Sequence, residues 1–194
     1  MIVKIQKIPD DLFNKLKKVI KDKSIEANKG LAGNIKEEYS LDKYIPLIEK
    51  FLFKVLKDNP KLLKTINFRY DCNSEDRPIK LKSFWVNYQK KNEFNPIHNH
   101  RGVISFIIFM KIPFLSKDQL KIAPGKKSCE NLPGVVQFIN FDYFTTLKTE
   151  NFFVDKTWEQ SMLIFPASYP HCVYPFYDVN EYRITLSGNL KIEV

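Results

Sequence analysis

The chain opens with a short stretch of alternating apolar and polar residues, followed by a stretch of helical periodicity. Residues 1–8 (MIVKIQKI) alternate with a period of two, which predicts a β-strand. After Pro9, the residues Asp10 and Asp11 supply a helix N-cap, and residues 10–23 repeat their apolar positions along one helical face. Those positions are Leu12, Phe13, Leu16, Val19 and Ile20. We therefore expect a strand and then an amphipathic helix that packs on a core.

A second amphipathic helix is predicted over residues 41–56 (LDKYIPLIEKFLFKVL), where the apolar positions again have helical spacing. Pro46 falls near the first turn of this helix, where a missing N–H breaks no helical hydrogen bond. The segment between the helices, residues 24–41, contains Gly30 and Gly33. We expect it to be an irregular segment that crosses the surface.

From residue 64 onward the period changes from helical to two. Alternating segments are separated by turns that contain Asn, Pro, Gly or charged residues. These segments are residues 64–72, 79–90, 102–114, 135–141, 145–154, 161–167, 172–177 and 182–194. Their number and spacing are typical of a β-sandwich or barrel, with the two helices packed outside it. No internal repeat or linker interrupts the chain, so we expect a mainly β (α+β) fold in a single domain over residues 1–194.

The composition indicates a compact soluble protein. Hydrophobic residues make up 44% of the 194 residues, which excludes a disordered chain. The three cysteines, Cys72, Cys129 and Cys172, form no CxxC pair and are odd in number, which favours a reducing compartment. No apolar run reaches the length of a membrane span. We therefore expect a cytoplasmic protein that has no membrane partner.

The net charge of +9 raises the question of a nucleic-acid partner. The basic residues are dispersed along the chain and are mostly Lys. Arg, which usually reads base edges and phosphate groups, is scarce. Nucleic acid is therefore an open but not favoured partner, and we expect the charge to serve mainly solubility.

The chain holds only three histidines, and two of them stand on alternate residues. His98 and His100 lie in FNPIHNHRG, and His171 lies in FPASYPHCVYPF. Because residues i and i+2 of a strand point to the same face, both neighbouring imidazoles would face one side. Neutral imidazole binds iron, zinc, copper and nickel. The three histidines are therefore candidate metal ligands; the alternative is that two imidazoles occur on a half-exposed strand by chance.

Three segments, in this order, resemble one known family. The first is FWVNYQKKNEFNPIHNHRGVISFIIFMKIP, with a Trp-x-Asn strand, a turn, H-x-H and a Ser-containing apolar strand that ends in Pro. The second is SMLIFPASYPHCVYPF, in which a strand runs into Phe-Pro and a histidine precedes Val-x-Pro. The third is NEYRITLSGNL, a closing Arg-Ile-x-x-Ser-x-Asn strand. Over roughly residues 80–190 the chain resembles 2-oxoglutarate- and Fe(II)-dependent oxygenases of marine bacteria and phages, and LAGNIKEEYSL is similar to the phage branch.

The resemblance implies a double-stranded β-helix, a jelly-roll barrel that holds Fe(II) near its open end. It implies that His98 is the first metal ligand and His171 the distal one. His100 falls where the wider superfamily has a carboxylate, although the family itself has H-x-H. A site of three histidines also suits Zn or Ni. Whether Glu93 or Asp178 supplies a carboxylate instead is left open.

The resemblance also implies an anchor for 2-oxoglutarate. In the superfamily an Arg or Lys on a strand after the distal histidine pairs with the far carboxylate of this co-substrate, and Arg183 stands in that region beyond His171. Ser187 is a candidate for an assisting hydroxyl on the same strand face, alongside Thr185. The alternative for Arg183 is a surface ion pair with Glu181.

Three further residues are expected to point into the same space. Asn87 is a candidate for cofactor binding, and Trp85 shares its strand face and lines either the pocket or the core. Asn189 closes the third motif and is expected to point inward. Cys172 should point away from the side that His171 faces, as a buried apolar filler.

The favoured function is that of a non-haem Fe(II), 2-oxoglutarate-dependent dioxygenase, which hydroxylates an unidentified substrate and releases succinate and CO2. The substrate, a small molecule or a protein, is expected to be selected by residues 24–40 and 114–133. A homodimer and, for a phage-encoded chain, the host cytoplasm are left open. Two alternatives are a three-histidine cupin-type metalloprotein that does not use 2-oxoglutarate and a non-catalytic jelly-roll binding module. A third is an oxygenase that modifies nucleic acid.

Overall fold

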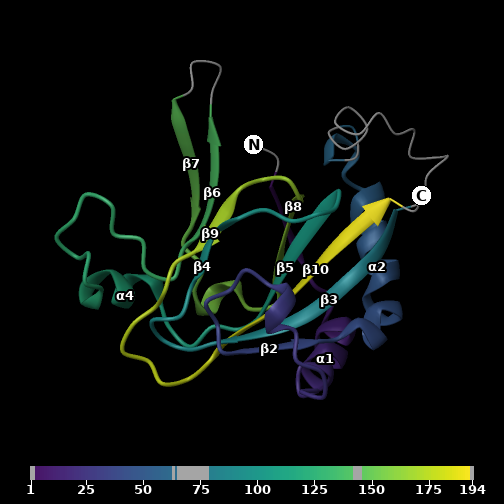
Figure 1. The fold of residues 1–194 in the computed structure, drawn as a ribbon, viewed down its shortest axis with the longest axis horizontal. Coiled ribbons are helices and arrows are strands. Elements are labelled where there is room, and N and C mark those ends of the chain that lie inside the picture. Colours follow the sequence, from purple (N-terminus) through teal and green to yellow (C-terminus); the bar gives the residue numbers. More distant parts are fainter. Residues whose placement is uncertain (1–2, 63, 65–78, 142–145, 193–194) are drawn as a thin grey trace.

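Two antiparallel β-sheets form the body of the molecule, and the helices α1 and α2 lie beside the larger sheet (Figure 1). The computed structural model describes residues 3–62, 64, 79–141 and 146–192. In spatial order, the larger sheet consists of β1 (Lys4–Lys7), β8 (Ser161–Pro166), β5 (Ile104–Lys111), β10 (Arg183–Ile192), β3 (Ile79–Gln89) and β2 (Glu37–Ser40). The smaller sheet consists of β4 (Asn95–His98), β9 (His171–Val173), β6 (Val136–Phe141) and β7 (Leu147–Phe152).

Each face of the larger sheet buries a separate apolar core. On β5, Phe106 and Ile108 pack in the core under the helices. Their neighbours Ile107 and Phe109 pack in a second core together with residues of the smaller sheet, such as Phe138. Successive side chains of a strand point to opposite faces, so β5 needs apolar residues at nearly every position. This explains the continuous apolar run in the sequence and shows that the two sheets face each other as in a jelly roll.

Both predicted N-terminal helices are present, with shifted ends. They are α1 (Asp10–Val19) and α2 (Ile45–Lys57). The prediction that Asp10 or Asp11 caps α1 is wrong, because Pro9 occupies the N-cap and both aspartates lie in the first turn. Their negative charges still favour the positive end of the helix dipole. Helix α2 starts later than predicted because a 3₁₀ turn, η2 (Asp42–Tyr44), precedes it; Pro46 lies in its first turn, as predicted.

The segment predicted to be irregular contains an additional strand. After a 3₁₀ turn, η1 (Asn28–Gly30), the strand β2 pairs with β3, and Glu38 lies opposite Asn87. Tyr39 packs against the core under the helices, which turns its neighbour Glu38 toward the opposite face. The pattern of apolar and polar residues did not predict this strand, because three of its four residues are polar.

Two short helical segments lie in the connections between the later strands. The segment 114–133 contains a helix, α4 (Ser116–Ile122), in which Gln119 makes two bonds to one residue. Its Nε2 donates to the carbonyl of Tyr177 at 2.9 Å, and its Oε1 accepts from the N–H of Tyr177 at 2.8 Å. A short 3₁₀ turn, η3 (Lys156–Trp158), precedes β8. The strand predicted over residues 64–72 lies almost wholly outside the described residues.

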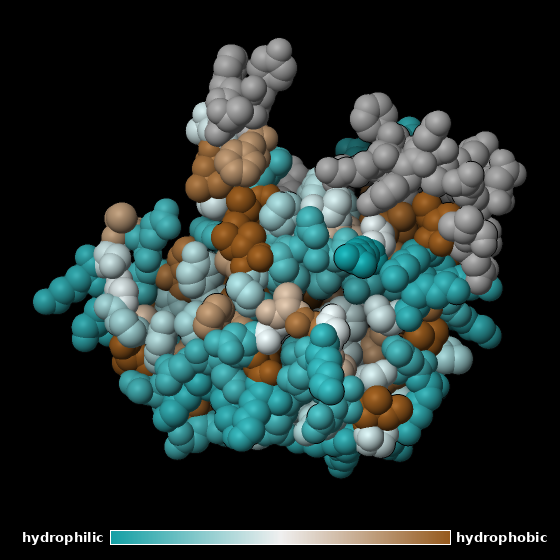
Figure 2. Space-filling view, viewed as in Figure 1, coloured by the Kyte–Doolittle hydropathy of each residue, from teal (hydrophilic) through white to brown (hydrophobic). Residues whose placement is uncertain are grey.

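The hairpin of β6 and β7 projects from the body of the molecule (Figure 1). Apolar side chains gather on it below the grey tip, whereas much of the remaining visible face is hydrophilic (Figure 2). Phe141 and Leu147, which are paired across the hairpin, are 60% and 58% exposed. Within the described residues, no helix is long and apolar enough to cross a membrane.

Candidate metal centre

The three histidines come from two strands of the smaller sheet and the turn that follows one of them. His98 ends β4 and His171 begins β9, and the two residues are direct partners in the antiparallel register. His100 lies beyond the end of β4, where its backbone N–H donates to the carbonyl of Ala167 at 2.8 Å. His100 is therefore positioned by a backbone hydrogen bond between two loops, and not by lying on the same strand as His98.

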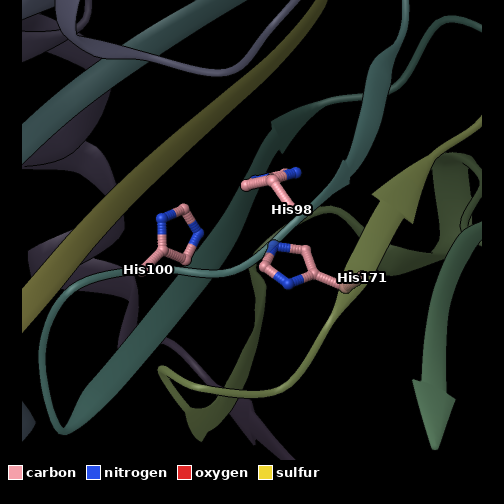
Figure 3. A group of neighbouring side chains, drawn as sticks. All are labelled: His98, His100 and His171. Atoms are coloured by element: carbon pink, nitrogen blue, oxygen red, sulfur yellow. The ribbon is translucent and has the colours of Figure 1, made fainter.

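The three imidazole rings converge on one space (Figure 3). The ring centroids lie 4.3 Å apart for His98 and His171, 4.9 Å for His98 and His100, and 5.0 Å for His100 and His171. One ligand nitrogen from each residue can be chosen so that all three lie within 4.8 Å of one another. Small side-chain movements would bring these atoms to the roughly 2 Å metal–nitrogen distances of histidine sites.

Backbone carbonyls fix which nitrogen of two rings is free. His98 Nδ1 lies 2.7 Å from the carbonyl oxygen of Pro96, and His171 Nδ1 lies 2.9 Å from that of Tyr169. A carbonyl oxygen only accepts, so each Nδ1 carries the proton and donates it. The lone pair is then on Nε2, which is the arrangement found in metal-bound histidines.

Burial keeps all three imidazoles neutral at neutral pH. Burial lowers the pKa of His98 below its usual value. Burial, together with the nearby His98, lowers the pKa of His100 to about 4 and that of His171 to about 3. His171 is the most deeply placed, stacked on Phe138 with ring centroids 5.4 Å apart. Neutral imidazoles bind metals without first losing a proton, so the cluster is ready to accept a cation.

The histidines line a pocket of about 610 Å³, within the usual size range of small-molecule sites. Four residues predicted for the site also line it: Trp85, Asn87, Ser187 and Asn189. Of the two segments expected to select the substrate, residues 24–40 contribute several lining residues, whereas residues 114–133 contribute none. The prediction for the second segment is therefore not supported by the pocket.

Asn87 holds the polar side chains of β3 and β10 in one network. Its Oδ1 accepts from the indole N–H of Trp85 at 3.1 Å. Its Nδ2 donates to the hydroxyls of Thr185 at 3.1 Å and Ser187 at 3.4 Å. Both the oxygen and the nitrogen of the Asn87 amide thus form hydrogen bonds. Asn87 orients the hydroxyls of Thr185 and Ser187, the two candidates for binding the co-substrate.

Arg183 lies deeper than the pocket wall. It is 1% exposed, so the alternative of a surface ion pair is wrong; Glu181 instead pairs with Lys111. The guanidinium lies 5.8 Å from the ring centroid of Phe109, the strand partner of Thr185. Thr185 in turn shares the Asn87 network with Ser187.

The guanidinium of Arg183 is under-satisfied in its buried position. Nη1 donates to the carbonyl of Gly134 at 3.0 Å, and Nε is buried without a partner. Burial lowers the pKa of Arg183 to about 9, so the group still carries its charge at neutral pH. A buried cation with an orphaned N–H fits an incoming carboxylate, which supplies both the charge and the acceptors that are missing.

The two carboxylates left open as metal ligands stand elsewhere. Glu93 accepts the backbone N–H groups of Lys36 and Lys90, and Asp178 is exposed. Among the described residues, no carboxylate belongs to the histidine group. Cys172 is buried, and its Sγ lies 3.8 Å from Oε1 of Gln137.

Glu38 and Asn95 are among the polar residues of the pocket that sequence reasoning missed. The signal for Glu38 was the alternation of Ile35, Tyr39 and Leu41 on odd positions, which places Glu38 on the opposite face. Asn95 lies in the histidine motif itself, but nothing in its spacing distinguishes it from a turn residue.

Comparisons with known proteins agree with this geometry. The model of the family described as "Putative 2OG-Fe(II) oxygenase" matches residues 83–189, which is more than half of the chain and includes every predicted site residue. No curated protein matches the chain.

Two solved structures are similar over nearly the whole chain. The viral collagen prolyl hydroxylase of Paramecium bursaria Chlorella virus-1, in complex with 2OG, has a TM-score of 0.52 at 12% identity, covering 99% of this chain and 96% of that chain. A prolyl-4-hydroxylase of Pseudomonas putida has a TM-score of 0.53 at 13% identity, with 99% and 93% covered. At such identities the likeness shows the fold, and the predicted double-stranded β-helix is confirmed.

Proposed function

Because the chain belongs to the 2OG-Fe(II) oxygenase family, we propose that it hydroxylates an unidentified substrate while converting 2-oxoglutarate to succinate and CO2. Fe(II) and 2-oxoglutarate are the cofactor and co-substrate of this family. The observation that carries the proposal is the convergence of three neutral imidazoles in one pocket. Family membership favours this function over a cupin-type protein that ignores 2-oxoglutarate and over a non-catalytic module.

His98, His100 and His171 would hold Fe(II). Two of the rings have their Nδ1 protons committed to backbone carbonyls, so Nε2 is presented to the metal. Three nitrogen ligands leave coordination positions open for the co-substrate and dioxygen. When bound, the metal and 2-oxoglutarate activate O2, of which one atom enters succinate and the other enters the substrate. His100, in place of a carboxylate, makes the ligand set uncharged.

Arg183 would bind the far carboxylate of 2-oxoglutarate. Its guanidinium is fixed by Gly134 on one side and leaves Nε unpaired, so a carboxylate would gain a charge-assisted bond without displacing a protein partner. Ser187 and Thr185, held by Asn87, would add hydroxyl donors along the same face. These residues orient the co-substrate; they transfer no proton in the proposal.

Metal binding provides the first test. Anaerobic reconstitution of the purified chain with Fe(II) should give one iron per chain, and His171→Ala should lose it. Cys172→Ala is the matched control, because it changes the adjacent residue, which contacts Gln137 instead of the histidine cluster, and it should retain iron. A wild-type chain that binds no stoichiometric iron would contradict the proposal.

The co-substrate provides the second test. Succinate release in the absence of a substrate should require both Fe(II) and 2-oxoglutarate. Oxygen consumption that is indifferent to 2-oxoglutarate would instead favour the cupin-type alternative. Whether the substrate is a small molecule or a protein, whether the chain forms a homodimer, and whether it acts in the cytoplasm stay predictions.

A further inference from the structure

The pocket contains a buried carboxyl group that the proposed reaction does not use. Glu38 is 1% exposed and lines the same pocket as the histidines. It faces the pocket because it lies on β2 directly opposite Asn87 of β3, and paired residues of adjacent strands share a face. Carboxylates are rarely buried unless they are paired, so the position calls for a partner.

Within the described residues, the partners of Glu38 are insufficient for a buried charge. Its Oε2 accepts from Nδ2 of Asn28 at 3.3 Å, but the same Nδ2 donates to the carbonyl of Ile35 at the shorter distance of 2.8 Å. No Lys or Arg of the described chain forms an ion pair with Glu38. The carboxyl group therefore has unused capacity to accept hydrogen bonds.

A buried acceptor that has no partner at all lies near the Glu38 carboxyl group. Oδ1 of Asn95 is buried and has no hydrogen-bond partner. A Cβ atom added to Gly33 would lie 2.8 Å from Oε1 of Glu38 and 2.9 Å from Oδ1 of Asn95. Both oxygens therefore lie against the backbone of Gly33 and close to each other, with no room for a side chain at position 33. A single group with two N–H donors can reach both oxygens.

The charges around the pocket do not cancel that of Glu38. Arg101 and Lys191 also line the pocket, but both are exposed, so solvent and salt screen them. Glu38 is buried, where the effective dielectric constant is lower and its interactions are stronger. The local preference at the Glu38 end is therefore for positive charge, although the whole chain has a net charge of +9.

We propose that Glu38 and Asn95 form a subsite that binds a cationic nitrogen group, an ammonium or a guanidinium, of the substrate hydroxylated at the histidine cluster. The inference rests on the proposed function and names the class of its substrate. Ammonium and guanidinium have several donors and no acceptor, which matches the unpaired oxygen of Asn95 and the weakly paired carboxyl group of Glu38. A neutral amide would also donate to both oxygens, but it would leave the carboxylate charge unpaired.

The titration of Glu38 agrees with this assignment. Burial, and secondly the negative charge of Glu93, raise the pKa of Glu38 to about 7. Near neutral pH a substantial fraction of the Glu38 carboxyl groups is therefore protonated, and a bound cation would favour the carboxylate form. At pH 8 the carboxylate form predominates, and cation binding should be strongest there.

A binding experiment with small probes tests the subsite directly. The full chain is titrated at pH 8 with methylguanidinium and with its neutral isostere methylurea, and binding is followed by NMR chemical shifts of the pocket residues. We expect methylguanidinium to bind at least about tenfold more tightly than methylurea, because a charge-assisted bond is stronger than a neutral one. Glu38→Gln should abolish that preference. Glu26→Gln, an exposed carboxylate of the same segment, should retain it.

Gly33→Ala provides a second variant, because its methyl group would collide with both oxygens and displace them from the positions that bind the probe. Equal affinity for the two probes, or a preference that survives in both Glu38→Gln and Gly33→Ala, would overturn the inference. Succinate release by the wild-type chain separates the two proposals. If succinate release requires 2-oxoglutarate but the protein binds methylguanidinium no more tightly than methylurea, the subsite is wrong and the proposed function stands. If the wild-type chain releases no succinate, the proposed function is wrong whatever the probes show.

The source of the cation is distinguished by a further arm of the succinate assay. The Nα-acetylated amino acids L-arginine and L-lysine are compared with blocked peptides that contain either residue, and Nα-acetyl-L-citrulline and Nα-acetyl-L-norleucine serve as the neutral counterparts. Stimulation by the acetylated amino acids assigns a small-molecule substrate, and stimulation by the peptides alone assigns a protein substrate. Equal stimulation by cationic and neutral members would contradict the role of Glu38.

Discussion

The two sides of β10 have opposite chemistry, although they belong to one strand of the larger sheet. On β10, Leu186 and Leu190 point to the helices and are completely buried in an apolar core. The opposite side of β10 carries Arg183, Thr185 and Ser187, which are also buried but are polar. One face therefore consists of side chains that gain free energy from leaving water, and the other of side chains that lose hydration.

This difference separates stability from function along a single strand. The helix-side residues have all their contacts within the chain. On the barrel side, Arg183 and Asn95 each have a buried atom without a partner, and Glu38 has only a shared donor. Such groups are destabilising unless a ligand completes them, so the barrel face is expected to be the less stable of the two until its ligands bind.

The largest effect on stability is expected on the helix face. Leu186→Ala removes a completely buried side chain and leaves a cavity under α1 and α2, so the free energy of unfolding should fall by about 2–5 kcal/mol. Ser187→Ala, the next residue on the opposite face, should lower it by only about 1 kcal/mol. Urea denaturation of both variants measures this, and equal losses would contradict the division of labour between the faces.

Arg183→Met should separate binding from stability on the barrel face. Methionine keeps much of the side-chain volume and removes a buried charge. The free energy of unfolding of the cofactor-free variant should therefore be close to that of the wild type and no lower than that of Leu186→Ala. The affinity for 2-oxoglutarate should fall at least about tenfold, because the charge-assisted bond is lost. Calorimetric titration of the Fe(II)-loaded protein without oxygen measures the affinity.

Lys111→Met is the control for Arg183→Met. Lys111 forms an exposed ion pair with Glu181, so its removal should leave the affinity for 2-oxoglutarate unchanged and change stability by less than about 1 kcal/mol. Unchanged affinity in Arg183→Met would mean that another residue anchors the co-substrate.

Gly188 tests how closely the helix face is packed. An added Cβ would lie 2.6 Å from Cζ of Phe106 and 2.8 Å from the backbone oxygen of Ser83. The backbone oxygen cannot move without disturbing the sheet, so Gly188→Ala should lower the free energy of unfolding by about 1–3 kcal/mol. Gly30→Ala, where an added Cβ has nothing within 4 Å, should be neutral or slightly stabilising. Equal behaviour of the two variants in thermal unfolding would contradict the close packing.

Local patterns in the sequence predicted much of the fold and part of the site. The long strands β3, β5 and β10 were predicted because their buried positions form long patterns in the sequence, and in β5 the apolar residues are nearly continuous. The H-x-H spacing and the later His171 indicated the metal cluster, because these residues belong to motifs that can be recognised one segment at a time. A single domain over residues 1–194 stays a prediction.

The remaining features depend on contacts between distant segments. Alternation within β2 places Glu38 opposite Tyr39, but Glu38 faces the pocket because β2 pairs with β3, and no local pattern contains this pairing between residues far apart in sequence. His100 is positioned by the carbonyl of Ala167, and the depth of Arg183 is set by Phe109 and Gly134. Polar residues in a short strand resemble a loop, so sequence reasoning misses them where they line a site.

The buried carboxyl group of Glu38 should also make the stability of the barrel face depend on pH. Burial and the nearby Glu93 raise the pKa of Glu38 from its ordinary 4.5 to about 7, so between these values the folded chain holds a proton that the unfolded chain has lost. The contribution of Glu38 to stability is therefore complete below pH 4.5 and is lost as the pH rises through 7. Wild type should lose stability relative to Glu38→Gln between pH 5 and 8 in urea denaturation.

Both proteins contain the three histidines, whose pKa values burial lowers, so the difference between wild type and Glu38→Gln isolates the carboxyl group. Arg101 and Lys191, the exposed cations of the pocket, are likewise common to both. A difference that stays constant from pH 5 to 8 would mean that the Glu38 carboxyl group is solvated in the folded chain. Methylguanidinium at pH 8 should stabilise wild type more than Glu38→Gln, because a ligand that binds only the folded state raises its stability. The subsite would then offset the cost of the carboxylate that the pocket buries.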